Sequence, residues 1–190
     1  DRLPRVNFQL LVDAPPIVEG EKAGAASIAG QLLRSGTTNR SKAEIDEAID
    51  FIGASLGASA GGVFGSSLTK HTDALLKIMQ EVVLTPSFPE EELTKIKDQL
   101  KSSLAASQED PNTIAGRVGD ILRYGADHPY GEFTTEQTID NITLADIRAY
   151  YDTYFKPNIS YLAIVGDISV AKAKQMANEY FGSWERGEVK

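Results

Sequence analysis

Apolar and polar residues alternate near the start of the chain, which is the pattern of a half-buried strand. The apolar positions are Val6, Phe8, Leu10 and Val12. Polar side chains such as Asn7 and Gln9 stand between them. A two-residue period predicts a β-strand with one buried face. The following Ala14-Pro15-Pro16 predicts the end of this strand, because proline cannot donate a ladder hydrogen bond.

Seven later segments place apolar residues at the spacing of one helical face. They cover residues 21–35, 41–52, 75–85, 89–104, 111–122, 143–155 and 170–181. Ser41 with Glu44 forms a capping box, and Pro89 before an acidic turn is typical of a helix start. In the fifth segment, four apolar side chains should face the core. They are Ile114, Val118, Ile121 and Leu122.

Three further short segments are predicted to be strands. Residues 54–60 and 63–68 flank Gly61-Gly62, a dipeptide typical of a hairpin turn. Residues 160–165 are apolar enough for a buried strand. Strands and helices are mixed along the chain, and no linker rich in Pro, Gly or Ser divides it. The pattern therefore predicts one α+β domain with antiparallel strand pairing.

Composition excludes several functions. The chain has 190 residues, of which 42% are hydrophobic and 24% charged, so it can bury one substantial core. Its formal net charge of -8 argues against nucleic acid as a partner, because phosphate binding needs clustered Lys and Arg. The absence of cysteine excludes disulfides and thiolate metal sites. No apolar stretch reaches membrane-spanning length, so we expect no membrane insertion.

The start of the chain suggests that it is part of a longer protein. It opens at Asp1 without a methionine and runs almost directly into a strand pattern. We therefore interpret residues 1–190 as a single module excised from a longer, two-module chain. The compartment, periplasm or cytoplasm, stays open.

Several short phrases occur in a distinctive order along the chain. They are LTPSFP at 84–89, DHPYG at 127–131, YDTYFKPN at 151–158, IVGD at 164–167 and YFGSW at 180–184. In this order and at these separations they closely resemble the first module of the pitrilysin-type metallopeptidases. That family includes insulinase, mitochondrial processing peptidase and the core proteins of the respiratory cytochrome complex. The resemblance covers nearly the whole chain.

The resemblance implies a fold and a metal site. The fold is an antiparallel sheet covered by helices, in modules that pair and face each other across a peptide chamber. The site is a His-x-x-Glu-His motif on the helix before a Gly-Thr pair. Two His four residues apart bind one zinc, and the Glu takes a proton from the zinc-bound water. A Glu on a later helix completes the metal shell.

Aligned on Gly36-Thr37, the resemblance places other residues at these positions. Ser27 and Gln31 stand where the two His are expected, and Gly30 stands where the catalytic Glu is expected. Aligned on the Asp110-Pro111 phrase, the third ligand falls at Ser102 or Ser103. Hydroxyl, amide and bare backbone cannot replace imidazoles and carboxylates. We therefore expect no catalytic residue and no metal in this module, although the family cofactor is zinc.

The two histidines of the chain offer no second zinc site. His71 precedes a helix, where a surface or capping role is the usual one, and His128 lies in the DHPYG phrase, where it is expected to fix the loop. Neither has a second ligand at helical spacing. We therefore do not expect a zinc enzyme built on these two residues.

One segment could still bind peptide. Residues 56–60 resemble the family strand that pairs with an extended peptide at a sheet edge. They are Leu56, Gly57, Ala58, Ser59 and Ala60. Small side chains would leave their backbone groups accessible for β-augmentation. The alternative is that this edge is covered or merely packs.

Two functions follow from the resemblance. In the first, the module is a non-catalytic half of a peptidase assembly, and a zinc-bearing homologous subunit or second module performs hydrolysis. In the second, it is a purely structural interaction subunit, like the respiratory core proteins. An active metallopeptidase on its own would need ligands that the chain lacks.

Overall fold

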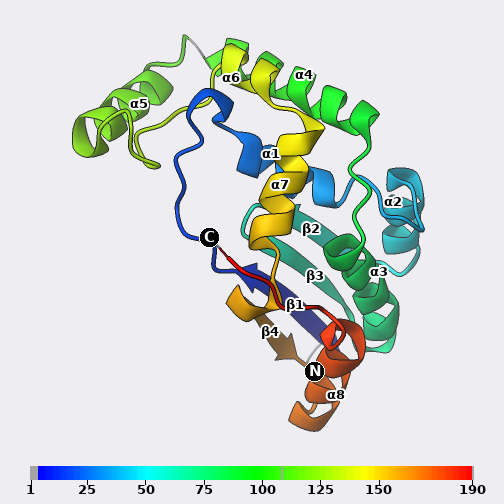
Figure 1. The fold of residues 1–190 in the computed structure, drawn as a ribbon. Helices are drawn as coiled ribbons and strands as arrows, with labels where there is room; N and C mark the ends of the chain where they lie inside the picture. The colour runs from blue at the N-terminus through cyan, green and yellow to red at the C-terminus, as the bar shows by residue number, and fades with distance from the viewer. Residues whose placement is uncertain (1–3, 108, 190) are drawn as a thin grey trace.

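The structure, a computed structural model, describes residues 4–107 and 109–189 (Figure 1). The strands in these residues are β1 (Arg5–Val12), β2 (Ser55–Ser59), β3 (Gly62–Leu68) and β4 (Ser160–Gly166). The helices are α1 (Ala25–Leu33), α2 (Lys42–Phe51), α3 (Thr72–Leu84), α4 (Glu90–Ser107), α5 (Pro111–Tyr124), α6 (Glu136–Asn141), α7 (Leu144–Tyr154) and α8 (Val170–Phe181). Among the described helices, none has the length and apolar character needed to cross a bilayer. The predicted α+β class is confirmed.

The strands form one antiparallel sheet in the order β2-β3-β1-β4. Phe8 of β1 lies opposite Gly65 of β3 on one side and Ile164 of β4 on the other. Val6, Phe8, Leu10 and Val12 are all buried, as their alternation predicted. This register sends their side chains to one face of the sheet, where the core forms.

Helices pack against this buried face of the sheet. Leu75 and Met79 of α3 lie closest to Gly65, and Met176 of α8 is fully buried in the same core. On the opposite face of the sheet, the side chains of Phe64 and Tyr161 are exposed. Antiparallel sheets commonly keep one face in water in this way. The sheet therefore has a packed side and an open side.

The segment 21–35 is not one continuous helix. A short 3-10 turn spans Gly20–Lys22, and α1 begins only after Gly24, whose φ is +104°. The carboxylate of Glu19 accepts hydrogen bonds from the N–H groups of Gly24 (2.8 Å) and Ala26 (2.6 Å). Glu19 therefore satisfies two of the free N–H groups at the start of α1.

A second carboxylate holds the preceding turn. The side chain of Glu132, in the loop before α6, accepts hydrogen bonds from the N–H groups of Glu19 (3.0 Å) and Gly20 (2.9 Å). The loop after α5 is thus tied to the start of α1 through two carboxylates. The sequence pattern predicted neither this connection nor α6.

The prediction of a buried strand at residues 160–165 is wrong. β4 is an edge strand in the described sheet, and Tyr161 and Val165 are exposed by 63% and 66%. Leu162 and Ile164 are only half-buried. Apolar composition alone does not distinguish a central strand from an edge strand beside an open sheet face.

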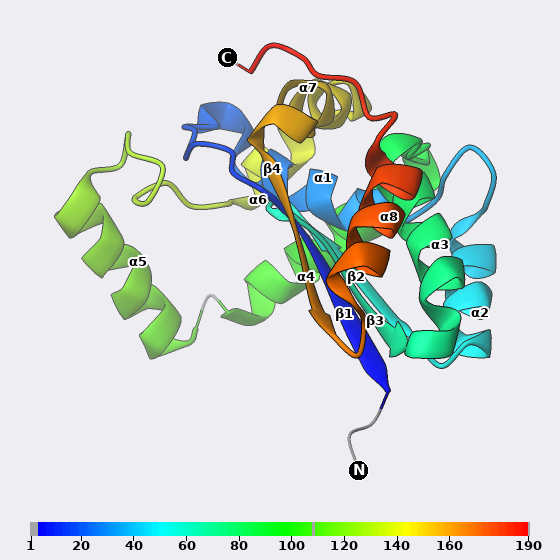
Figure 2. The same ribbon diagram turned by 90° about the horizontal axis from the view of Figure 1, so that it is seen from below.

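The prediction for the helix at residues 111–122 is also wrong in part. α5 forms, and the Asp110 carboxylate caps it by accepting from the N–H of Thr113 (3.1 Å). Its apolar residues do not face the core, however: Ile114, Val118 and Leu122 are exposed by 48%, 50% and 82%, and only Ile121 is half-buried. Figures 1 and 2 both show α5 lying apart from the sheet and its covering helices.

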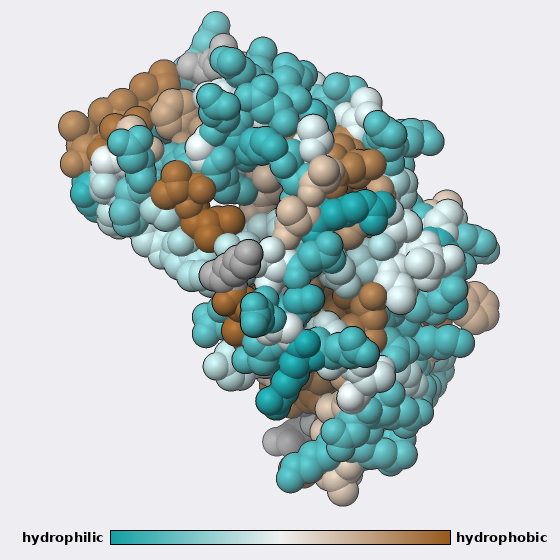
Figure 3. Space-filling model, viewed as in Figure 1, coloured by the Kyte–Doolittle hydropathy of each residue, from teal (hydrophilic) through white to brown (hydrophobic). Residues whose placement is uncertain are grey.

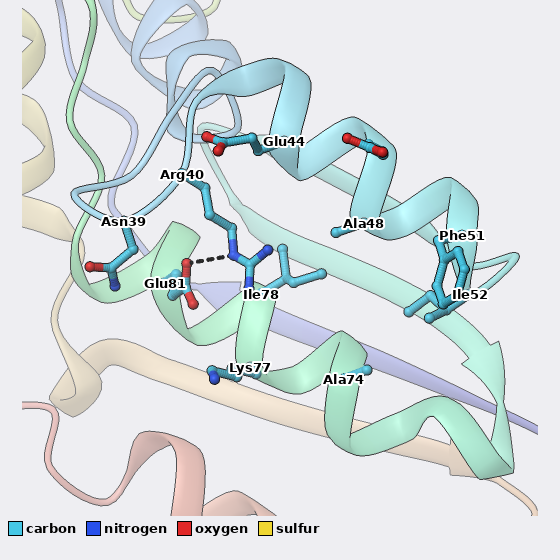
Figure 4. Close-up of a pocket in the computed structure, with 11 residues that line it drawn as sticks. Asn39, Arg40, Glu44, Ala48, Phe51, Ile52, Ala74, Lys77, Ile78 and Glu81 are labelled. Carbon is cyan, nitrogen blue, oxygen red and sulfur yellow. Dashed lines mark hydrogen bonds and ion pairs between the residues drawn. The ribbon is translucent and has the colours of Figure 1, made fainter.

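A partly buried ion pair joins the α1–α2 connection to α3 (Figure 4). Arg40 Nε donates to Glu81 Oε2 at 3.1 Å, at one end of a groove of about 850 Å³ between α2 and α3. The Thr37 hydroxyl also donates to Glu81 Oε2 (3.4 Å) and accepts from the N–H of Arg40 (3.0 Å). The side chain of Glu81 is only 10% exposed, so it depends on these partners.

Replacing Arg40 with methionine should destabilise the fold. The carboxylate of Glu81 would keep its burial and lose its cation, which we expect to lower the free energy of unfolding by about 2 kcal/mol. The double variant Arg40→Met, Glu81→Met should recover most of this loss, because it removes both charges. Urea unfolding followed by circular dichroism measures both values. Equal stability of Arg40→Met and the wild type would contradict the assignment.

Candidate functional site

α1 carries three of the four positions aligned with the zinc motif, and it packs directly on the β2–β3 turn. Gly30 is buried in this contact. A Cβ atom added at Gly30 would lie 2.1 Å from the backbone nitrogen of Ala60 and 2.2 Å from the carbonyl carbon of Ser59. Both atoms belong to the backbone, so a side chain at this position requires the turn to move. Glycine is therefore a packing requirement here.

The other two positions on α1 face outward. Ser27 and Gln31 are exposed, and Gln31 Nε2 donates to Ser27 Oγ at 3.5 Å. The two residues lie one helical turn apart, as the spacing of the two motif histidines requires. Ser27 and Gln31 therefore share one outward face of α1, called the motif face here because the resemblance aligns it with the zinc motif.

The structure distinguishes the two candidates for the third ligand position on α4. Ser102 Oγ donates to the carbonyl of Asp98 in its own helix at 2.8 Å. Ser103 instead lines a cavity of about 280 Å³ together with Ser27, Arg117 of α5 and Phe133. The fold thus brings Ser27 and Ser103 to one cavity from segments far apart in sequence. The assignment of these positions to a lost zinc site stays a prediction.

The residues present do not fit a zinc ion. Zinc takes imidazole, thiolate or carboxylate ligands, and this face offers hydroxyl and amide groups. Within residues 4–107 and 109–189, no three His, Cys, Asp or Glu side chains come together to form a metal site. His71 lies at the start of α3 without capping it, and His128 Nδ1 accepts from the N–H of Tyr130 at 3.1 Å in its own loop.

β2 lies at the free edge of the described sheet, beside a groove. The groove has a volume of about 620 Å³ and runs between β2, α1 and α4. It is lined by Gly57, Ala58, Phe64, Gln31, Arg34, Ser35, Lys42, Glu92, Lys95, Ile96 and Gln99. Gln31 therefore connects the motif face of α1 to the strand edge. An extended segment laid in this groove would meet both.

Two features limit the predicted peptide-binding strand. Leu56, Gly57, Ala58 and Ser59 belong to β2, whereas Ala60 lies in the turn after it. The Ala60 carbonyl accepts from the Tyr150 hydroxyl at 3.3 Å, so this acceptor already has a partner. Burial raises the pKa of Tyr150 to about 12, so the phenol keeps its proton at neutral pH.

The ring of Phe64 covers part of this strand. Phe64 stands directly across from Gly57 in the β2–β3 ladder, and a Cβ atom at Gly57 would lie 2.2 Å from its ring. The side chain of Phe64 is 53% exposed, so the ring also faces the groove. The sequence pattern did not single out Phe64. The cross-strand pairing of a glycine with an aromatic residue is the signal that could have found it.

Two protein-family models match the chain. Residues 3–119 match the family model described as "Insulinase (Peptidase family M16)". Residues 141–190 match the model described as "Peptidase M16 inactive domain". The chain therefore belongs to the insulinase family of peptidases, which is the pitrilysin-type family that its phrases resemble.

Curated relatives carry the names of zinc proteases. One from Rickettsia felis, "Uncharacterized zinc protease", is 24% identical over 174 residues, covering 88% of this chain and 42% of the relative. "Uncharacterized zinc protease YmxG" of Bacillus subtilis is 24% identical and covers 85% of this chain and 41% of the relative. The chain thus spans less than half the length of the curated relatives it matches.

Solved structures show the same fold. A peptidase M16 inactive domain from Pseudomonas fluorescens matches with a TM-score of 0.87 and 25% identity, covering 99% of this chain and 47% of that chain. A protease from Helicobacter pylori matches with a TM-score of 0.87 and 20% identity, covering 100% of this chain and 48% of that chain. The first half of the periplasmic protease PqqL from Escherichia coli matches with a TM-score of 0.79 and 18% identity, covering 98% of this chain and 43% of that chain.

Replacing Gly30 with alanine should destabilise the module. The new Cβ would meet the backbone of the β2–β3 turn, and we expect the free energy of unfolding to fall by about 2 kcal/mol. Gly116→Ala, in α5, is the matched control, because no atom lies within 4 Å of its added Cβ. That variant should gain about 1 kcal/mol from better helix propensity. Urea unfolding compares the two, and a stabilised Gly30→Ala variant would contradict the packing argument.

Proposed function

We propose that this module is a non-catalytic half of a pitrilysin-type metallopeptidase assembly. It forms one wall of the peptide chamber, while a zinc-bearing homologous subunit or second module performs the hydrolysis. The observation that carries this proposal is the contact of Gly30 with the β2–β3 turn. A chain under selection for its own catalysis needs a carboxylate at that position to accept a proton. In this chain, the backbone of Ser59 and Ala60 occupies the space that a side chain at Gly30 would need.

Membership of the family supports a pairing of this non-catalytic module with a zinc-bearing one. The curated relatives that match are named zinc proteases, and they are more than twice as long as this chain. One matched family model describes an inactive domain. A non-catalytic half needs the fold of the family but does not need a base at the position of Gly30. Reconstituting zinc ligands at Ser27, Gln31 and Ser103 would still leave Gly30 without room for a base.

We further propose that the groove beside β2 holds the peptide in an extended form. The free edge of β2 offers backbone groups for pairing, and the small side chain of Ala58 leaves the approach there uncrowded, whereas the Phe64 ring covers Gly57. Phe64 supplies an exposed aromatic surface next to that edge. The peptide would lie over Gln31, on the face that aligns with the zinc motif.

Reconstitution tests the proposed function. The natural polypeptide that carries this module is purified, mixed with each homologue from the same organism that has an intact His-x-x-Glu-His motif, and assayed with fluorogenic peptides. We expect one mixture to hydrolyse peptide roughly tenfold faster than the homologue alone, equivalent to about 1.4 kcal/mol of transition-state stabilisation. A zinc chelator should abolish the activity of the mixture.

Three results would reject the supporting role. Tightly bound zinc on the purified module would show that it holds its own metal. Full activity of the homologue without the module would leave the module nothing to support. A stable complex that hydrolyses no peptide would favour a purely structural subunit.

Replacing Phe64 with alanine should weaken peptide binding. In the active mixture we expect the KM for peptide to rise roughly fivefold, since about 1 kcal/mol of aromatic contact is lost. Tyr161→Ala is the matched control, because Tyr161 is an exposed aromatic residue on the opposite edge strand. Equal KM values for both variants would place the peptide elsewhere.

A further inference from the structure

α5 presents an apolar ridge that nothing in the described residues covers. Ile114, Val118 and Leu122 follow one another at four-residue spacing, so their side chains form one line along the helix. No residue of α5 is buried, and Leu122 is 82% exposed. The space-filling view shows a concentration of hydrophobic residues over α5, away from the sheet (Figure 3).

Small residues flank this ridge on one side. Ala115 and Gly119 lie four residues apart beside Val118 and Leu122. No atom lies within 4 Å of a Cβ added at Gly119. Glycine in a helix interior is unfavourable compared with alanine, and this structure offers no packing reason for it. A second helix can approach closely where such a ridge of large apolar side chains lies beside small residues.

An aromatic cluster continues the surface at the end of α5. The ring centroids of Tyr124 and Tyr130 lie 5.4 Å apart, and the His128 ring lies 5.4 Å from Tyr124 and 5.3 Å from Tyr130. All three side chains are exposed, Tyr130 by 56%. Rigid aromatic residues of this kind are enriched in the central parts of protein interfaces.

The same helix reaches the motif face. Arg117 of α5 lines the cavity that Ser27 and Ser103 share, and its guanidinium lies 5.7 Å above the Phe133 ring. In the apolar ridge, Val118 follows Arg117 directly and Ile114 lies one helical turn before it. A partner seated on the ridge would therefore close this side of the cavity.

We propose that the apolar ridge of α5, with the Tyr124–His128–Tyr130 cluster, is the docking surface for a helix of the second, zinc-bearing pitrilysin-type module. This inference rests on the proposed function and names the contact through which the two halves meet. The flank of small residues lets a helical partner approach closely. The likeness to the first half of the periplasmic protease PqqL supports a second module of the same family as the occupant, and the position of Arg117 places it beside the motif face.

Binding measurements with paired variants test the docking surface. The probe is the purified zinc-bearing homologue, titrated against the natural polypeptide by calorimetry. We expect the double variant Val118→Ser, Leu122→Ser to bind roughly tenfold more weakly than the wild type, as loss of interface anchors does. The matched control is Phe51→Ser, Val170→Ser, which removes two exposed apolar side chains elsewhere (89% and 73% exposed) and should bind as the wild type does.

Gly119→Ala gives an independent readout. It should raise the melting temperature of the module alone, because alanine is the better helix former. It should also weaken the complex, because a methyl group would fill the flank that the partner helix approaches. A structural role of Gly119 within the module would move both values in the same direction.

Each outcome decides the proposal. Equal affinity of wild type and Val118→Ser, Leu122→Ser overturns the docking surface and leaves the proposed function standing. Absence of a complex with every zinc-bearing homologue overturns both. Loss of the complex in this variant, with no peptide hydrolysis by the wild-type complex, supports the surface and rejects the function. Dimers of the module alone that the variant abolishes make a second copy the occupant, which overturns the proposal.

Discussion

The closeness of α1 to the β2–β3 turn is the constraint on which the candidate site depends. Gly30 lets the helix lie against the backbone of Ser59 and Ala60, and the same approach fixes the height of Gln31 above the edge of β2. Tyr150 holds the turn from the other side through the Ala60 carbonyl. The strand edge, the groove and the motif face therefore all depend on one close contact. A side chain at Gly30 would disturb all three.

The sequence predicted most of the packed side of the molecule. The alternation of Val6 to Val12 predicted β1, and the capping box of Ser41 and Glu44 predicted the start of α2. These patterns succeed because each element buries one face in the same core. The errors at β4 and α5 have the opposite origin. Their apolar residues lie on an open sheet face and on a helix that stands apart. An apolar sequence pattern does not distinguish residues buried in the core from residues on an exposed apolar surface.

The candidate site was predictable in part. Family phrases aligned Ser27, Gly30 and Gln31 with the zinc motif, and this alignment stays a prediction; the structure places all three residues on α1, before Gly36-Thr37. The phrases were not sufficient to choose between Ser102 and Ser103, since the choice depends on how α4 faces α1. The roles of Phe64 and Arg117 also depend on tertiary contacts: one covers a glycine across the ladder, and the other reaches the cavity from a distant helix. Spacing along the chain does not carry such information.

The two carboxylates at the start of α1 have a structural consequence. The Glu132 carboxylate accepts hydrogen bonds from the backbone N–H groups of Glu19 and Gly20. The Glu19 carboxylate in turn accepts from N–H groups at the start of α1. The loop that carries Glu132 is also the segment that leads away from α5. Two acidic side chains thus connect the segment that follows α5 to the start of the helix that bears Ser27 and Gln31, without crossing the sheet.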